Sequence, residues 1–205
     1  MSLRTRTRVA LVGAGHAHLH VLRHAHRLRA AGVDLQLVAP RYFHYSGLAT
    51  GVLSGALPRA SAEVDVAALT ARFSVEHFVT EAVGVDLSTR RLRLQDGGDL
   101  GFDAVSFNVG SVVRDPDHLA GVPGVWTAKP LARLFDLRDR VAAYLRRHRR
   151  SPALVVAGGG QSGFEIAAAL AGLIARHGVR PKIRLAISAP ARWGPRGASP
   201  PLSPR

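Results

Sequence analysis

The chain has 205 residues, of which 47% are hydrophobic, so it can form a buried core and is not a disordered polypeptide. It contains no cysteine, which excludes disulfide scaffolds, thiolate metal sites and cysteine nucleophiles, and leaves redox chemistry to a bound cofactor. The formal net charge is +14, but the basic residues are almost all arginines scattered along the chain, so charge alone does not indicate a nucleic-acid partner.

The N-terminal region has the pattern of a βαβ unit. Residues 8–12 (RVALV) form a short apolar run that ends in Gly-Ala-Gly. An alanine- and leucine-rich helical pattern follows and ends at Gly32, and residues 35–39 (LQLVA) predict a second strand. The apolar run before the glycines is too short for a signal peptide.

The turn of this unit fits part of the GxGxxG fingerprint of dinucleotide-binding folds. Gly13 and Gly15 fill the first two positions, but His18 stands at the third, where glycine normally permits close packing of helix and strand. The acidic residue that usually binds the adenosine ribose is absent from the end of the second strand, since Asp34 lies at its other end. We expect backbone groups or Arg41 to hold the ribose instead.

Histidines also crowd this turn. His16, His20 and His24 have the i, i+4 spacing that places two metal ligands on one helix face. No acidic residue lies among them, and the helix begins in a phosphate-type turn. We therefore expect no metal site and interpret His16 as a polar neighbour of a bound anion.

The middle of the chain changes pattern twice. In residues 42–57, Gly47, Gly51 and Gly55 have the spacing of one helix face, which permits close approach either of another helix or of a ligand. Residues 75–111 predict a small β-meander with a hairpin turn at QDGGD, followed by a buried strand in FDAVSFNVGS.

A helix is predicted for residues 131–147, and the run RRHRR at 146–150 is typical of a helix C-terminus stabilised by its dipole. A nucleic-acid patch is the alternative, but no recognition motif accompanies it, and we expect no nucleic-acid partner. The longest apolar run, residues 166–175, is shorter than the roughly 20 residues that a membrane span needs.

Residues 153–178 repeat the design of the N-terminus, with a strand, a glycine turn and a long helix. Gly158, Gly160 and Gly163 occupy all three fingerprint positions, and residues 182–188 predict the second strand. After residue 190 the sequence has no periodicity and is rich in Pro, Gly, Ser and Arg, which predicts a disordered tail.

The sequence thus predicts an α/β fold with two Rossmann-like βαβ dinucleotide-binding units and a small β-meander, both units being incomplete. We expect residues 1–118 to form the first unit with the meander, 119–151 a connecting segment and helix, 152–189 the second unit, and 190–205 the tail.

The two turns, the YSG segment and FDAVSFNVGS resemble those of the FAD/NAD(P)-dependent pyridine nucleotide-disulfide oxidoreductase superfamily. The sequence is most similar to its type II NADH dehydrogenase-like branch, including the flavoprotein domains joined to selenide, water dikinase. Over roughly residues 8–190, this resemblance implies FAD in the first unit, NAD(P)H in the second, and electron transfer to a quinone-like acceptor.

The resemblance also implies the site residues. Asn108, Gly110 and Ser111 match a family turn beside FAD, and Glu165 matches a family glutamate near the nicotinamide. A surface glutamate stabilised by the helix dipole is the alternative for Glu165. The residues expected to bind the cofactors are Gly13, Ala14, Gly15, His16, Ala17, His18, Arg41, Ser46, Gly47, Asn108, Gly110, Ser111, Gly158, Gly160, Gln161, Ser162 and Gly163, with Glu165 as the candidate catalytic residue.

Relatives of this kind return to the FAD domain after the nicotinamide domain, so the resemblance implies a C-terminally truncated chain. The absence of cysteine argues against the disulfide-reducing and sulfide-oxidising relatives. We expect a cytoplasmic protein, with peripheral association at the inner face of the membrane in the full-length family. The alternative to an enzyme is a nucleotide-binding remnant without turnover.

Overall fold

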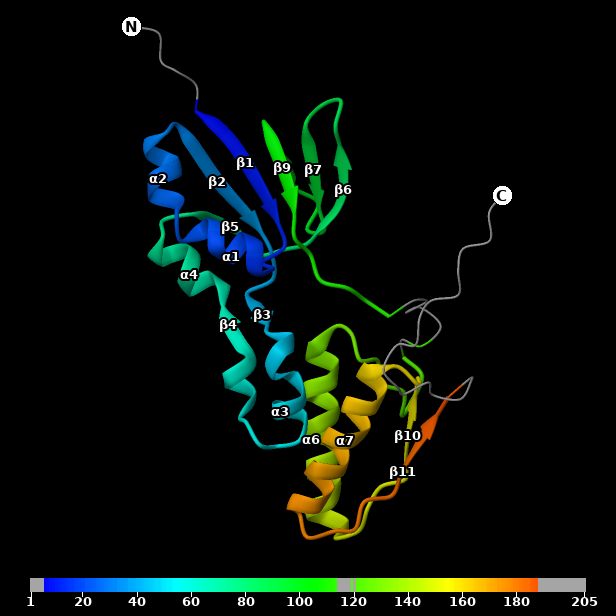
Figure 1. Ribbon diagram of the computed structural model, residues 1–205. Helices are drawn as coiled ribbons and strands as arrows, with labels where there is room; N and C mark the ends of the chain where they lie inside the picture. Colours follow the sequence, from blue (N-terminus) through cyan, green and yellow to red (C-terminus); the bar gives the residue numbers. More distant parts are fainter. Residues whose placement is uncertain (1–5, 114–118, 120, 188–205) are drawn as a thin grey trace, which may run out of the picture. The chain divides into compact units, whose positions relative to one another are not determined.

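The computed structural model describes residues 6–113, 119 and 121–187 (Figure 1). The tail expected at 190–205 lies outside these residues. The chain divides into two compact units, one made of Met1–Ala49 and Pro58–Phe135, the other of Thr50–Leu57 and Asp136–Arg205. Each unit contains one of the two predicted βαβ patterns.

The first unit is built on a four-stranded parallel sheet with the order β5-β2-β1-β9. Strand β1 (Thr7–Val12) pairs with β2 (Val33–Val38) along its whole length and with β9 (Ala104–Phe107) on its other side. Helices α1 (His16–Leu22) and α2 (Ala25–Ala30) connect β1 to β2, as the sequence predicts.

Successive side chains of β1 and β2 point to opposite faces of this sheet, and both faces are buried. Leu11, Leu35 and Leu37 face helices α1, α2 and α4 (Val66–Arg72). Ala10 and Val12 face an antiparallel sheet of β6 (Ala82–Asp86), β7 (Arg91–Leu94) and β8 (Asp99–Gly101). A strand covered on both faces reads as a continuous apolar run, which is why residues 8–12 are so easily recognised.

Four short elements link β2 to α4 within this unit. Strands β3 (Tyr42–His44) and β4 (Glu63–Asp65) pair antiparallel, and the 3-10 helices η1 (Ser46–Leu48) and η2 (Arg59–Ala62) flank them. Strand β4 and helix α4 were not predicted from the sequence.

Two expectations for residues 75–111 are wrong. Strand β5 (Glu76–Phe78) joins the parallel sheet beside β2, whereas the sequence assigned it to the meander. Strand β9 is an edge strand and not a buried one, and Phe107 is 53% exposed. Both segments are only three or four residues long, so their composition does not reveal which strand they pair with or how well they are covered.

The single helix face expected for Gly47, Gly51 and Gly55 is not formed. Gly47 lies in η1, Gly51 lies in α3 (Ala49–Leu53), and Gly55 follows α3 in the left-handed region with φ +73°. A Cβ on Gly51 would lie 2.8 Å from the Leu57 side chain. Glycine at this position therefore lets the Leu57 side chain, which follows α3, pack against the helix.

The second unit contains α3, most of α6 (Leu131–His148), and the βαβ pattern of β10 (Leu154–Ala157), α7 (Gln161–Arg176) and β11 (Ile183–Ala186). The two strands pair in parallel with Leu154 opposite Ile183. Helix α6 ends within the arginine run, as expected. Across the residues that the structure describes, no helix is both long and apolar enough to cross a membrane.

Candidate functional site

The two glycine turns have the same backbone construction. In each, the N–H of the first glycine donates to the carbonyl of the last residue of the second strand: Gly13 to Val38 at 2.8 Å, and Gly158 to Ala186 at 2.9 Å. In each, the second glycine is the N-cap of the helix, with φ and ψ of −64° and 171° at Gly15 and of −80° and 174° at Gly160. The two turns are therefore structural equivalents.

The turn of the second unit is open. Gly158 has φ +128°, a conformation that favours glycine, and an added Cβ at Gly158 or Gly160 would meet no atom within 4 Å. By contrast, a Cβ at Gly163 would lie 2.1 Å from the Gly158 carbonyl oxygen. The third glycine thus lets the helix pack on the turn, while the first two leave the backbone accessible.

Helix α7 begins at this turn with free donors. Its first intrahelical bond runs from the Phe164 N–H to the Gly160 carbonyl at 3.2 Å, so the amides of Gln161, Ser162 and Gly163 have no partner within the helix. Gly160 provides no side-chain cap. With the positive dipole end of a 16-residue helix, these amides can bind an anionic group.

The turn of the first unit is capped from within the chain by Asn108. The backbone oxygen of Asn108 accepts from the Gly15 N–H at 3.0 Å. Its side-chain Oδ1 accepts from the amides of Ala17 at 3.1 Å and His18 at 3.5 Å. A Cβ at Gly15 would lie 2.2 Å from this Oδ1, so only glycine permits the approach. The residue that follows β9 therefore takes up two first-turn amides of α1.

His18, at the position of the third glycine, is buried with 2% of its surface exposed. Its Nδ1 lies 2.7 Å from the Gly13 carbonyl oxygen, and its Nε2 lies 2.9 Å from the Ser106 hydroxyl oxygen. Because a carbonyl only accepts, Nδ1 carries the proton and Nε2 accepts from Ser106 in the neutral ring. The imidazole thus ties the turn to β9, where Gly163 instead packs directly on the equivalent carbonyl.

His16 is exposed at the start of α1 and has two aromatic neighbours. Its ring is in edge contact with the rings of Phe43 and Tyr45, with centroids 5.2 Å apart in both pairs. Helix α1 ends at Leu22, so His24 does not continue its face, although the His20 and His24 rings touch. Among the described residues no group of three potential metal ligands occurs.

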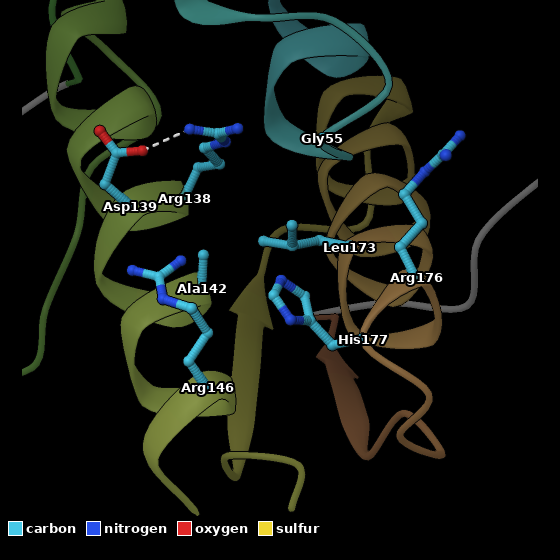
Figure 2. A pocket seen from close by; sticks show the side chains of 8 residues that line it. All are labelled: Gly55, Arg138, Asp139, Ala142, Arg146, Leu173, Arg176 and His177. Atoms are coloured by element: carbon cyan, nitrogen blue, oxygen red, sulfur yellow. Dashed lines mark hydrogen bonds and ion pairs between the residues drawn. The ribbon is translucent and has the colours of Figure 1, made fainter. Parts of the chain in front are cut away.

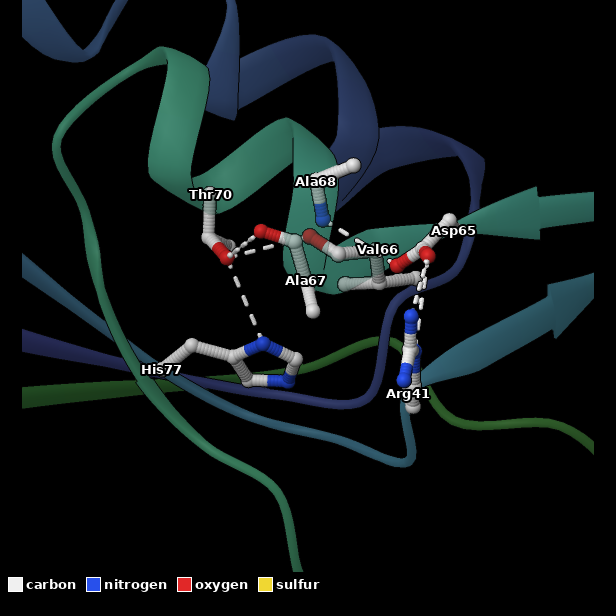
Figure 3. A network of polar contacts seen from close by, with 7 residues as sticks. All are labelled: Arg41, Asp65, Val66, Ala67, Ala68, Thr70 and His77. Carbon is white, nitrogen blue, oxygen red and sulfur yellow. Dashed lines mark hydrogen bonds and ion pairs between the residues drawn. The ribbon is translucent and has the colours of Figure 1, made fainter.

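Arg41 lies in a polar network at the start of α4 (Figure 3). Its Nη2 donates to Asp65 Oδ2 at 3.0 Å, and Asp65 Oδ1 accepts from the Ala68 amide at 3.1 Å as the N-cap of α4. The hydrogen bond from Arg41, followed by that from Ala68, holds the pKa of Asp65 below its ordinary value. Arg41 therefore has a structural partner in addition to any contact with a ribose.

The same network closes against β5. The Thr70 Oγ1 lies 3.0 Å from the carbonyl oxygens of Val66 and Ala67 and 3.3 Å from His77 Nδ1, and His77 Nε2 lies 3.0 Å from the Ala39 oxygen (Figure 3). These contacts fix α4 over the carboxyl ends of β2 and β5, the edge of the sheet where a ligand of such a fold binds.

Ala14 is buried in the core of the first unit, whereas the remaining expected residues lie at the surface. Ser46 and Gly47 are exposed in η1, and Gly110 and Ser111 are exposed after β9. Glu165 is exposed on α7 and accepts a hydrogen bond from Gln161 Nε2 at 3.4 Å, one helical turn earlier.

Sequence reasoning missed three residues around the first turn: Ser106, Phe43 and Tyr45. Ser106 is a polar residue within the short apolar strand β9, a departure that could have suggested a buried polar partner. Phe43 and Tyr45 precede the YSG segment, but nothing in their spacing indicates contact with His16. Asp65 could have been found, because an Asp just before a helical pattern is a typical N-cap.

Comparison with known protein families places these features in one family. A family model described as pyridine nucleotide-disulphide oxidoreductase matches residues 7–185. No curated protein sequence matches the chain.

Solved structures share the fold at low sequence identity. The ferredoxin reductase for the CYP199A2 system from Rhodopseudomonas palustris is 21% identical with a TM-score of 0.63, over 87% of this chain and 42% of its own. The NADH:rubredoxin oxidoreductase from Clostridium acetobutylicum is 14% identical with a TM-score of 0.58, over 88% and 44%. The sulfide:quinone oxidoreductase from Aquifex aeolicus is 15% identical with a TM-score of 0.58, over 74% and 34%. The chain spans less than half the length of each.

Proposed function

The chain belongs to the pyridine nucleotide-disulphide oxidoreductase family, and from this premise we propose that it acts as an FAD-dependent NAD(P)H oxidoreductase. FAD is assigned to the first unit and NAD(P)H to the second. Within the family, the chain is assigned to the type II NADH dehydrogenase-like branch, with a quinone-like acceptor. The matched construction of the Gly13–Gly15 and Gly158–Gly163 turns is the observation that supports this most strongly.

The second turn fits a dinucleotide as it stands. A diphosphate needs accessible backbone amides and a helix N-terminus, and both are present at Gly158, Gly160 and the start of α7. Gln161 and Ser162 would contribute amides to the diphosphate. Glu165, one turn further along α7, is the side chain proposed to act beside the nicotinamide.

The first turn fits after one local change. Asn108 Oδ1 accepts from the amides of Ala17 and His18 that the diphosphate of FAD would use. An asparagine amide carries two N–H donors as well as an acceptor, so its rotation would free these amides and offer donors to a phosphate oxygen. Gly110, Ser111, Ser46, Gly47 and Arg41 remain proposed contacts of the same cofactor.

In this assignment the cofactors supply the redox chemistry and the protein binds and orients them. FAD, when bound, supplies the acceptor for the hydride that the nicotinamide donates. The residues of this chain bind and orient the two dinucleotides through backbone amides. No cysteine is present to serve as a redox thiol in this chain, so the proposal does not include disulfide or sulfide chemistry.

The assignment of one cofactor to each turn can be tested with two charge variants. Asn108→Asp keeps an acceptor for the α1 amides, and Gly160→Asp adds an N-cap in open space, so both are expected to fold. Each places a negative charge where a diphosphate would bind. We expect Asn108→Asp to weaken FAD binding at least tenfold, and Gly160→Asp to weaken NADH binding at least tenfold.

The readouts are quenching of FAD fluorescence and NADH titration by calorimetry, with circular dichroism melting to check folding. Ala168→Asp is the matched control, because Ala168 is exposed on α7 away from the turn. The proposal fails if the two variants exchange their effects, or if Ala168→Asp weakens NADH binding as much as Gly160→Asp does.

A further inference from the structure

A cavity of about 390 Å³ lies within the second unit, between α6, α7 and the end of α3 (Figure 2). Helix α6 contributes Arg138, Ala142 and Arg146, α7 contributes Leu173 and Arg176, and His177 follows directly as the C-cap of α7. The α7 residues belong to the last turns of the helix, whereas the glycine turn lies at its beginning. At 1.5 Å per residue, the two places are about 15 Å or more apart along α7.

The cavity is cationic at its rim and apolar at its floor. Three guanidinium groups line it against a single carboxylate, that of Asp139. Asp139 Oδ1 accepts from Arg138 Nη1 at 2.6 Å, which partly neutralises that arginine. The three arginines against the one carboxylate leave an excess of two positive charges. A dianion, such as a phosphate monoester, would balance it, whereas a single carboxylate would not.

Two of these arginines have an explanation that needs no ligand. Arg146 and Arg176 lie in the last turns of α6 and α7, where cations are stabilised by the helix dipole and the terminal carbonyls. Arg138 lies in the middle of α6, away from the dipole of the helix end, and its Nη1 is paired with Asp139, which leaves its Nε to be accounted for.

Arg138 also carries the observation that points to a ligand. Its Nε is buried and has no hydrogen-bond acceptor among the described residues. A buried N–H without an acceptor is destabilising, so such groups normally have a partner. The Arg138 side chain is 27% exposed, so a rotation of its guanidinium toward the cavity would offer the Nε edge, which can donate two parallel hydrogen bonds to a phosphoryl group.

We propose that this cavity binds a small phosphate-bearing molecule. Arg138 and Arg146 on α6 donate to the phosphoryl oxygens, and His177, the C-cap of α7, faces Arg146 as a further donor (Figure 2). The cavity is larger than an inorganic phosphate requires, and Ala142 and Leu173 provide an apolar floor for the rest of the molecule. This site is separate from the dinucleotide turn of the same unit.

The protein is titrated with inorganic pyrophosphate, and binding is monitored through the imidazole NMR signal of His177. This signal is assigned by its absence from the spectrum of His177→Gln. We expect saturable binding that shifts this signal, with affinity reduced at least tenfold in Arg138→Gln. Arg140→Gln is the matched control, because Arg140 is an exposed arginine of α6 outside the cavity. Arg146→Gln replaces Arg138→Gln if that variant does not fold.

Three results would overturn the proposal. The first is a His177 signal that pyrophosphate does not move. The second is an equal loss of affinity in Arg140→Gln, which would indicate non-specific attraction to a basic helix. The third is binding to phosphatidic acid vesicles without binding to free pyrophosphate, which would assign the site to a lipid headgroup.

Gly160→Asp separates this site from the dinucleotide turn. We expect it to leave the pyrophosphate-induced shift of His177 unchanged while it weakens NADH binding. If Gly160→Asp abolishes the His177 shift, pyrophosphate binds at the turn and the cavity has no ligand of this kind. Failure of NADH binding alone would count against the proposed function but not against the cavity.

Discussion

His18 and Gly163 stand at the same position of equivalent turns and solve one packing problem differently. Gly163 lets α7 approach the Gly158 carbonyl so closely that a Cβ would lie 2.1 Å from its oxygen. In the first turn the Gly13 carbonyl instead accepts a hydrogen bond from the His18 imidazole at 2.7 Å. The departure from the fingerprint is thus compensated by a polar contact, which a lone sequence motif does not reveal.

Gly163→Ala tests the packing at the second turn. The added Cβ must displace the backbone of Gly158, so we expect the free energy of unfolding to fall by about 1–3 kcal/mol. Gly172→Ala is the control in the same helix, because its Cβ would meet only the Ser54 side chain at 3.6 Å. We expect Gly172→Ala to raise the stability by about 0.5–1 kcal/mol, since alanine is the better helix former. Urea unfolding followed by circular dichroism measures both, and equal effects would contradict this packing.

His18→Ala tests the buried imidazole. The substitution leaves the Gly13 carbonyl and the Ser106 hydroxyl without this partner, so we expect a loss of about 1–3 kcal/mol in unfolding free energy. His26→Ala changes an exposed histidine of α2 and is expected to alter stability by less than about 0.5 kcal/mol. The same urea unfolding compares the two variants. A loss in His18→Ala no greater than that in His26→Ala would show that the imidazole does not tie α1 to β9.

At the scale of elements, the strands and helices that carry strong periodicity could be predicted from the sequence. The two βαβ patterns, the hairpin at QDGGD and helix α6 are confirmed. Strand β5 was assigned to the wrong sheet, because a strand of three residues carries no pattern that distinguishes a parallel from an antiparallel neighbour. Helix α4 was missed because its seven residues are too few to show a clear helical period.

The capping of α1 by Asn108 could not be read from the sequence either. Asn108 lies 91 positions from Ala17, and only the pairing of β9 beside β1 brings the two together. The sequence predicts bare amides at both turns. The structure agrees at Gly158–Gly163, but at the first turn Asn108 accepts from two of them. Long-range register, which local patterns do not encode, decides this difference.

The turn between β6 and β7 predicts a specific pH dependence. Hydrogen bonds from the Ser88 hydroxyl and then from the Thr89 amide lower the pKa of Asp86 to about 2, against an ordinary value of 3.8. Because the folded state holds the lower pKa, the stabilisation is present above the ordinary pKa and is lost as the pH falls from about 5 towards 2. We therefore expect wild type to lose more stability over this range than Asp86→Ala.

Urea unfolding at pH 7, 4 and 2.5 checks this expectation. The wild-type and Asp86→Ala unfolding free energies should converge as the solution becomes acidic. Parallel curves for the two proteins would show that Asp86 is not held as an anion by this turn.

At the scale of the whole molecule, the chain carries two equivalent dinucleotide-type turns in two separate compact units. Within residues 136–187, the part of the second unit's C-terminal segment that the structure describes, the sheet consists of β10 and β11, and Val155 on β10 is 65% exposed. Parallel sheets are normally covered on both faces, so an apolar side chain as exposed as that of Val155 is unusual for such a strand. The chain also spans less than half the length of its structural relatives. The oxidoreductase activity is therefore a proposal for this chain, and it rests on the two glycine turns and on the family.

Anaerobic titration of the FAD-loaded chain with NADH, followed by visible absorbance, tests the assignment of one dinucleotide to each unit most directly. If both turns bind as proposed, flavin remains with the protein through gel filtration, and its visible band bleaches in proportion to the NADH added until one equivalent is consumed. A chain that retains no flavin, or whose retained flavin stays oxidised in excess NADH, would contradict the account.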